Sequence, residues 1–123
     1  MARIIIAEDE SLISEMLQLQ LELFGHNVID KVRTGKEAVK ACELYTPDVV
    51  FMDISMEKSD DGIYACAEIK KNNPDIRVIF LTAYPKCVYA DILVNIPHDG
   101  YIEKPSIAVH IGNVLANLGY HTG

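Results

Sequence analysis

Residues 49–56 read Val49-Val50-Phe51-Met52-Asp53-Ile54-Ser55-Met56, an apolar run that ends in an acid. A run of this kind, with no alternation of apolar and polar residues, is typical of a strand that is buried on both faces. Such strands belong to parallel sheets whose two faces are covered by helices. The strands expected along the chain are Arg3–Ala7, Asn27–Val32, Asp48–Asp53, Arg77–Thr82 and Gly100–Glu103.

Segments of helical period separate these strands, and their ends carry capping signals. Ser11 can cap the first helix, and Gly25 ends it. Within that helix, the spacing of four apolar residues predicts a single stripe that packs on the core. The stripe consists of Leu12, Met16, Leu19 and Leu23.

The second and third helices have capping signals of their own. Thr34 with Glu37 is typical of a capping box at the start of the second helix. Asp60 or Asp61 can cap the third helix. The residues expected on the buried side of that third helix are Ile63, Ala67 and Ile69.

Two more helices complete the alternation. The fourth is expected over 86–95, between two prolines, and the fifth runs from about Ser106 and stops at Gly119. Because strand and helix alternate five times, the sequence predicts an α/β domain with a doubly wound five-stranded parallel sheet. The residues expected to be buried in the fifth helix are Ile107, Val109, Ile111, Val114 and Leu118.

Composition excludes several classes of protein. The chain has 123 residues, of which 50% are hydrophobic and 24% are charged, and this fits one globular domain with its own core. A net charge of −7 argues against a nucleic-acid-binding surface. The three cysteines, Cys42, Cys66 and Cys87, indicate neither a disulfide framework nor a zinc site. No apolar run suits a signal peptide or a membrane span, so we expect a cytoplasmic protein.

Acidic side chains gather where the predicted strands end. Glu8 and Asp9 follow the first strand, Asp53 ends the third, Thr82 ends the fourth, and Lys104 follows the fifth. Because the carboxyl ends of parallel strands meet at one edge, we expect these side chains to converge. Three carboxylates in one place would repel one another strongly without a cation. Oxygen ligands suit Mg²⁺, so the sequence predicts a magnesium site.

A flavodoxin-type nucleotide site is one alternative at this edge, and the sequence argues against it. Such a site needs backbone donors and hydroxyls after the first strand, whereas Glu8-Asp9-Glu10 would repel a bare phosphate. A phosphate can approach these residues only together with a metal ion.

Five segments, taken in chain order, resemble the receiver domain of two-component response regulators, a family that includes chemotaxis receivers. The resemblance covers essentially the whole chain and implies a flavodoxin-like three-layer sandwich with strand order 2-1-3-4-5. The segments are Ile4-Ile5-Ile6-Ala7-Glu8-Asp9-Glu10, Val49-Val50-Phe51-Met52-Asp53-Ile54-Ser55-Met56, Asp61-Gly62-Ile63, Phe80-Leu81-Thr82-Ala83-Tyr84 and Gly100-Tyr101-Ile102-Glu103-Lys104-Pro105.

The resemblance implies a role for each of the acidic residues. Asp53 is then the phosphoacceptor, which takes a phosphoryl group from a phosphohistidine on a sensor histidine kinase. Asp9 and Asp53 are the expected direct ligands of Mg²⁺, and Glu8 contributes directly or through water. Ser55 offers only its backbone carbonyl. Few protein ligands are needed, because Mg²⁺ keeps several of its waters.

The resemblance also implies a switch. Lys104 is expected to contact one phosphoryl oxygen and Thr82 another. When Thr82 moves toward the phosphoryl group, Tyr101 can rotate inward. This motion changes the surface made by the fourth helix, the fifth strand and the fifth helix. That surface is expected to bind a downstream protein, still to be identified, or a second copy of the chain.

The sequence therefore predicts a single receiver domain over residues 1–123 of a two-component phosphorelay, with no output domain present. Such a receiver either acts alone through surface contacts or is one part of a longer regulator. We expect a signalling phosphoacceptor, not an enzyme, with neither nucleic acid nor membrane as partner. A Mg²⁺-dependent phosphohydrolase of the haloacid dehalogenase type is an alternative, but it needs a second aspartate where this chain has Ser55. A pseudo-receiver that binds a partner without phosphorylation is another, and Thr82, Lys104 and the intact acids argue against it.

Overall fold

A computed structural model of the chain describes residues 1–57, 60–104 and 114–120. The strands are β1 (Arg3–Ala7), β2 (Asn27–Val32), β3 (Val49–Asp53), β4 (Arg77–Thr82) and β5 (Gly100–Glu103). The helices are α1 (Ser11–Leu23), α2 (Gly35–Tyr45), α3 (Asp61–Asn72), the 3₁₀ helix η1 (Lys86–Tyr89) and α4 (Ala90–Leu93).

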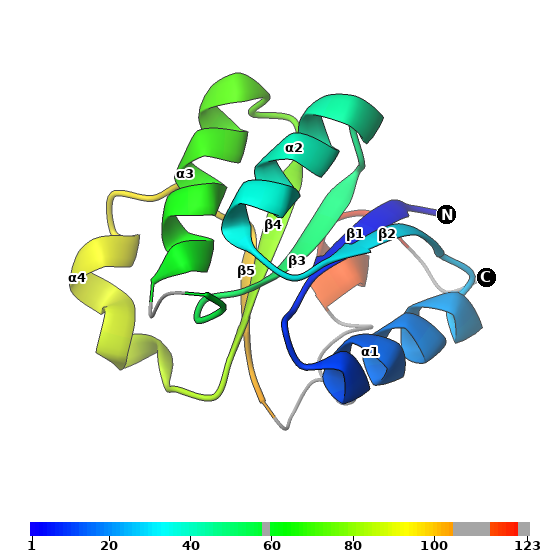
Figure 1. Cartoon of the computed structure of the whole chain (residues 1–123), viewed down its shortest axis with the longest axis horizontal. Coiled ribbons are helices and arrows are strands. Elements are labelled where there is room, and N and C mark those ends of the chain that lie inside the picture. Colours follow the sequence, from blue (N-terminus) through cyan, green and yellow to red (C-terminus); the bar gives the residue numbers. More distant parts are fainter. Residues whose placement is uncertain (58–59, 105–113, 121–123) are drawn as a thin grey trace.

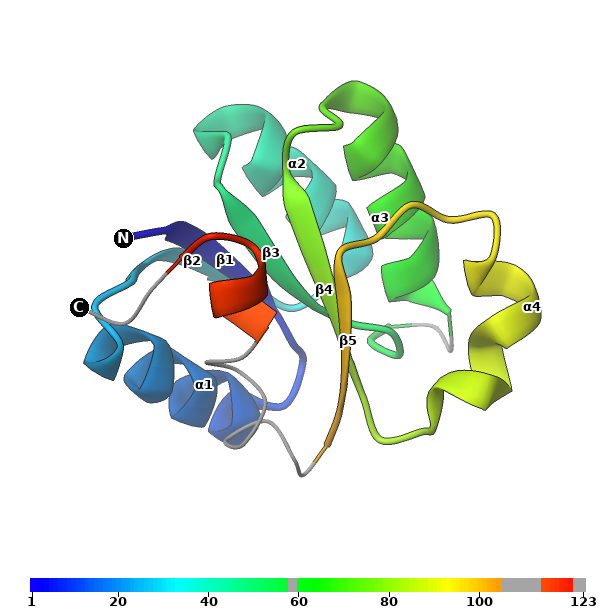
Figure 2. The same cartoon turned by 180° about the vertical axis from the view of Figure 1, so that it is seen from behind.

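The five strands form one parallel sheet in the order β2-β1-β3-β4-β5. Helices α2 and α3 cover one face, α1 covers the other, and α4 lies beside α3 (Figures 1 and 2). The predicted fold and strand order are confirmed. The third strand begins at Val49, one residue later than expected.

Helices on both faces explain the unbroken apolar run of β3. All five residues of this strand are buried. Val50 and Met52 pack into the core shared with α2 and α3, whereas Val49 and Phe51 pack into the core shared with α1. The strand that ends in Asp53 is therefore held from both sides, which suits a residue whose position must be fixed.

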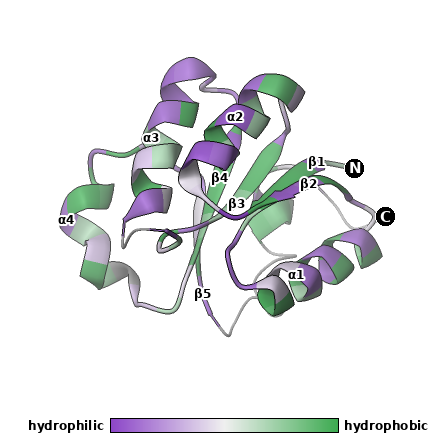
Figure 3. Cartoon of the chain, viewed as in Figure 1, coloured by the Kyte–Doolittle hydropathy of each residue, from purple (hydrophilic) through white to green (hydrophobic). Residues whose placement is uncertain are grey.

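The apolar stripe predicted to be buried in α1 is instead exposed. Leu17 and Leu21 of this helix pack against the sheet, and Ser14, nearer the N-terminal end of the helix, is also buried. Hydrophobic segments therefore remain on its outer side (Figure 3). The prediction failed because α1 carries two apolar stripes, and periodicity alone does not say which one faces the core. The exposed fractions are 70% for Leu12, 60% for Met16, 64% for Leu19 and 83% for Leu23.

The capping predictions have mixed outcomes. Ser11 is the first residue of α1 and not its cap, since Glu10 occupies the cap position without a side-chain hydrogen bond. Thr34 caps α2 as predicted, because its hydroxyl accepts a hydrogen bond from the Glu37 amide at 3.1 Å. The Glu37 carboxylate reaches back to the Arg33 amide at 2.9 Å, which completes the capping box.

Helix α3 begins where the sequence places it, but without the expected cap. Asp60 occupies the cap position and its side chain makes no capping hydrogen bond. Ile63 and Ile69 are buried as predicted, whereas Ala67 is only partly buried.

The predicted fourth helix is broken into two short pieces, η1 and α4. Both lie within the expected range 86–95, and the 3₁₀ turn follows Pro85 directly. Pro85 fixes an extended backbone at the entry, and the segment buries little besides Leu93, so it lacks the packing that would support a longer helix.

The end of the chain is described only in part. Residues 114–117 are helical and Leu115 is buried, while Val114 and Leu118 are partly buried. Gly119 follows with a φ of +93°, which supports the predicted helix end. The predicted positions of Ile107, Val109 and Ile111 lie outside the described residues. Within the described ranges, no helix is long and apolar enough to cross a bilayer.

A buried histidine, His26, holds the N-terminal end of the chain. The Ala2 amide donates a hydrogen bond to its Nδ1 at 3.0 Å, so Nε2 carries the proton of the neutral ring. Nε2 has no hydrogen-bond partner among the described residues. Burial, together with the charge of the N-terminus, lowers the pKa of His26. The folded protein therefore binds this proton less tightly than the unfolded chain does.

We expect the contribution of His26 to the free energy of unfolding to be constant above about pH 7. It should decrease as the pH drops below about 6.5, the pKa of an unperturbed histidine. His26→Leu should remove this component of the pH dependence, and His98→Gln should leave it in place. Urea denaturation of the three proteins at several pH values measures it. An equally steep dependence in His26→Leu would contradict the assignment.

Candidate functional site

The carboxyl ends of four strands bring Glu8, Asp53, Thr82 and Lys104 to one edge of the sheet. Asp53 is the last residue of β3. Ala7, which precedes Glu8, pairs with Met52, which precedes Asp53. Thr82 ends β4 and pairs with Glu103, which precedes Lys104. The side chains of this edge are unusually well shielded for polar groups, since Glu8 is 1% exposed, Asp53 4% and Thr82 1%.

Lys104 forms an ion pair with each of two buried carboxylates. Its Nζ lies 2.5 Å from Glu8 Oε1 and 3.3 Å from Asp53 Oδ2. The sequence argument held that the converging acids need a cation, and within this fold the ammonium group supplies one positive charge. When both acids are ionised, one ammonium compensates only one of the two carboxylates, and in that state the site has an affinity for further positive charge.

Burial makes the charged forms of both acids costly. It raises the pKa of Glu8 to about 8, against the opposing attraction of Lys104. Burial likewise raises the pKa of Asp53, while Lys104 and the Ser55 amide act in the other direction. The two carboxylates raise the pKa of Lys104 more than burial lowers it, so the ammonium stays charged. The site is therefore a buried pair of acids that share one fixed cation.

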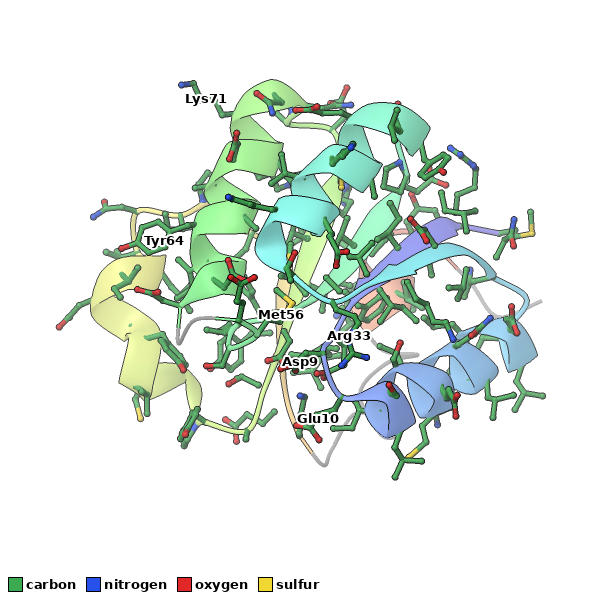
Figure 4. All side chains as sticks on the ribbon, in the orientation of Figure 1. Asp9, Glu10, Arg33, Met56, Tyr64 and Lys71 are labelled. Carbon is green, nitrogen blue, oxygen red and sulfur yellow. The ribbon has the colours of Figure 1, made fainter. Side chains whose placement is uncertain are left out.

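Further carboxylates surround this pair. Carboxylate oxygens of Glu8, Asp9 and Glu10 all lie within 4.8 Å of one another. The Glu10 amide donates to Glu8 Oε2 at 3.1 Å, which turns the other carboxylate oxygen toward Lys104. Asp9 lies between Arg33 and Met56 in Figure 4. Two of the predicted ligands, Glu8 and Asp9, thus lie together with Glu10, which was not predicted, whereas Asp53 and Ser55 are not part of this group of three. Carboxylate oxygens are the donors that Mg²⁺ prefers, so the acidic cluster is of a kind that suits this ion.

The loop after Asp53 is held by backbone contacts. The Ser55 amide donates to Asp53 Oδ1 at 3.2 Å and thereby orients the carboxylate. The Gly62 amide donates to the Ile54 carbonyl at 2.8 Å, so the start of α3 returns to the end of β3. A Cβ atom at Gly62 would overlap the Asp53 carbonyl oxygen. Sequence reasoning placed Gly62 only in a motif, and this close approach is its physical reason.

Thr82 and Tyr101 are linked directly. The Thr82 hydroxyl accepts a hydrogen bond from the Tyr84 amide at 3.2 Å. The Tyr101 hydroxyl donates to the Tyr84 carbonyl at 3.0 Å. Burial raises the pKa of Tyr101 to about 12, and a side-chain hydrogen bond with Thr82 opposes that rise. The Thr82 hydroxyl, the Tyr84 backbone and the Tyr101 hydroxyl therefore form one connected set of hydrogen bonds.

The chain is similar to known proteins in both sequence and structure. The family described as "Response regulator receiver domain" matches residues 4–115. The transcriptional regulatory protein PdtaR of Mycobacterium tuberculosis is 40% identical over 105 residues, which are 84% of this chain and 49% of that protein. The phyllosphere-induced regulator PhyR of Methylorubrum extorquens is 42% identical over 84 residues, which are 68% of this chain and 31% of that protein. The chain thus spans a third to a half of the length of these curated relatives.

A solved structure shows the same architecture. The CheX–CheY–BeF₃–Mg²⁺ complex from Borrelia burgdorferi matches with a TM-score of 0.85 and 25% identity, over 95% of this chain and 88% of that one. The likeness extends across the sheet and its helices.

Proposed function

Because this chain belongs to the response regulator receiver family, we propose that it is a phosphoacceptor of a two-component phosphorelay and that Asp53 accepts the phosphoryl group. The observation that carries the proposal is the position of the Asp53 carboxylate. It is buried at the end of β3 and lies 3.3 Å from the ammonium of Lys104. We assign residues 1–123 to one receiver unit in the cytoplasm, and it acts in signalling and not as an enzyme on a separate substrate.

The transfer is a displacement at phosphorus. An oxygen of the Asp53 carboxylate attacks, a P–O bond forms, and the P–N bond to the histidine of the kinase breaks. The electron pair of that bond returns to the imidazole ring. The product is an acyl phosphate on Asp53, and its phosphoryl oxygens carry new negative charge into a buried site.

The surrounding residues make that charge tolerable. Glu8, Asp9, Asp53 and the Ser55 carbonyl would hold Mg²⁺, which lessens repulsion between carboxylate and phosphoryl group when bound. Lys104 places its ammonium on a phosphoryl oxygen and so leaves Asp53 Oδ2. An ammonium already held beside the reacting carboxylate needs little movement to reach the developing charge.

Thr82 carries the change to the surface. The Thr82 hydroxyl leaves the Tyr84 amide for a phosphoryl oxygen. Tyr101 then loses its side-chain hydrogen bond with Thr82. The surface of α4, β5 and the fifth helix changes as the ring turns in. Val88, Ile92 and Val94 are exposed apolar residues in this region, at 57%, 42% and 77%. A downstream protein or a second copy of the chain binds there, and neither nucleic acid nor membrane is a partner of this unit.

The exposed stripe of α1 is the surface on which the kinase docks. It begins with Leu12, three residues after Asp9, so a partner helix laid along it ends beside the acidic site. We expect Leu19→Lys to slow phosphoryl transfer from an autophosphorylated histidine kinase at least about tenfold, as loss of a docking residue does.

The control for this prediction is a small phosphodonor. Labelling of Leu19→Lys by acetyl phosphate should match the wild type, because this donor needs no protein surface. Leu44→Lys, which changes an equally exposed leucine on α2, should accept from the kinase at the normal rate. Equal losses with both donors would mean that the substitution harms the site and not the docking.

Labelling with acetyl phosphate and Mg²⁺, followed by intact-mass measurement, tests the proposal itself. We expect one phosphoryl group per chain, and none when the metal is removed with EDTA. Continuous turnover of small phosphomonoesters would favour the phosphohydrolase. The sequence argues against this function, because Ser55 occupies the position of the second acid that it needs. A folded chain that takes no label from any donor would instead be a pseudo-receiver.

A further inference from the structure

We propose that Asp61 is a positioning residue: it fastens the start of α3 to the start of α2 and so fixes the loop that follows Asp53 for metal binding. The inference rests on the proposed Mg²⁺ site. It assigns a task to a side chain that touches neither the metal ligands nor the phosphoacceptor.

The first observation is where the Asp61 carboxylate points. Asp61 is the first residue of α3, yet its Oδ2 accepts a hydrogen bond from the Gly35 amide at 3.0 Å. Gly35 is the first residue of α2 and is buried. The amides of a first helical turn have no hydrogen-bond partner within their own helix. A carboxylate near them also interacts favourably with the positive end of the helix dipole. Asp61 therefore acts as a cap for a helix other than its own.

The second observation connects this cap to the site. The peptide after Asp61 carries the Gly62 amide, which is bonded to the Ile54 carbonyl at 2.8 Å. Gly62 also has no room for a Cβ atom against the Asp53 carbonyl. A shift at Asp61 is therefore passed through one peptide unit to the backbone that carries Asp53. Ser55, whose carbonyl is the proposed ligand, lies within the loop that this bond closes.

The third observation is the fit of Gly35 to the anchor. A Cβ atom at Gly35 would lie 2.5 Å from Asp61 Oδ1, and 3.0 Å from both its Cγ and its backbone carbonyl oxygen. Gly35 does not have the positive φ that would require glycine. Alanine would otherwise improve the helix, so the glycine is explained by the carboxylate that occupies the space.

A titration with Mg²⁺ by isothermal calorimetry tests the proposal. We expect Asp61→Ala to raise the dissociation constant about tenfold, the effect of losing a group that orients metal ligands. Asp61→Asn keeps an oxygen acceptor for Gly35 and should bind close to the wild-type value. Gly35→Ala displaces the carboxylate without a change of charge and should weaken binding as Asp61→Ala does.

Asp60→Ala is the matched control. It removes the same charge one residue away, from a side chain that makes no capping bond, and should leave the affinity near the wild-type value. Thermal unfolding in EDTA shows which variants fold, and Asp61→Asn and Gly35→Ala keep the test valid should Asp61→Ala fail to fold.

Three results would overturn the inference. One is an unchanged Mg²⁺ affinity in Asp61→Ala or Gly35→Ala, even with a lower melting temperature, since the anchor would then serve stability alone. Another is an equal loss in Asp60→Ala, which would point to charge at long range. The third is a wild-type chain that binds no Mg²⁺, and only this result removes the proposed function as well.

Discussion

We expect Asp53→Asn to abolish labelling by acetyl phosphate, whereas the wild-type chain should gain one phosphoryl group. The amide has the shape of the carboxylate but no nucleophilic oxygen, so the loss is complete. The fold should not suffer. Burial raises the pKa of Asp53, which means that the site disfavours the charged form, and a neutral amide relieves this cost. Intact-mass measurement and thermal unfolding of the same sample check both statements.

Asp75→Asn is the matched control for that result. Asp75 is an exposed aspartate before β4, and its loss should leave the label unchanged. A phosphoryl group that persists in Asp53→Asn would place the acceptor at another residue.

Lys104→Met has the second large effect, and it acts on both reactivity and stability. Removal of one preorganised charge lowers the rate of phosphorylation about 10²- to 10³-fold. Glu8 and Asp53 also lose their shared cation, and an unpaired buried charge destabilises a fold by about 3 kcal/mol or more. Protonation of Glu8, whose pKa burial raises to about 8, limits this loss already near neutral pH, and protonation of Asp53 limits it further as the pH falls.

Metal dependence separates the two effects of Lys104→Met. Added Mg²⁺ should restore much of the variant's stability, since it replaces the missing positive charge, but not its rate. Urea denaturation with Mg²⁺ and with EDTA measures the first, and time courses of labelling measure the second. Lys71→Met, at an exposed lysine far from Asp9 in Figure 4, serves as control. A variant as stable as the wild type in EDTA would show that the ion pairs contribute little.

The fold could be predicted from the sequence because its strongest signals are local. The unbroken run before Asp53 indicates burial on both faces, and the structure confirms this for every residue of β3. The convergence of strand ends follows from topology, and Glu8 and Lys104 do meet Asp53. The roles of these residues stay predictions until the labelling is done.

What the sequence could not supply depends on contacts between distant segments. The face of α1 that packs on the sheet is decided by Leu17 and Leu21, which have the same period as the exposed stripe. The partner of Asp61 is 26 residues away, so its spacing resembles an ordinary cap of α3. That Lys104 forms an ion pair with both Glu8 and Asp53 also follows only from distances.

The position of Lys104 has a consequence for how the cell can use this chain. An ammonium already lodged among the carboxylates lets the polypeptide stay compact when magnesium is scarce. We therefore expect the supply of Mg²⁺ to affect the rate at which Asp53 is phosphorylated and not the stability of the fold. We expect the stability of the fold and the rate of phosphorylation to depend on two different cations, the ammonium of Lys104 and Mg²⁺ from solution.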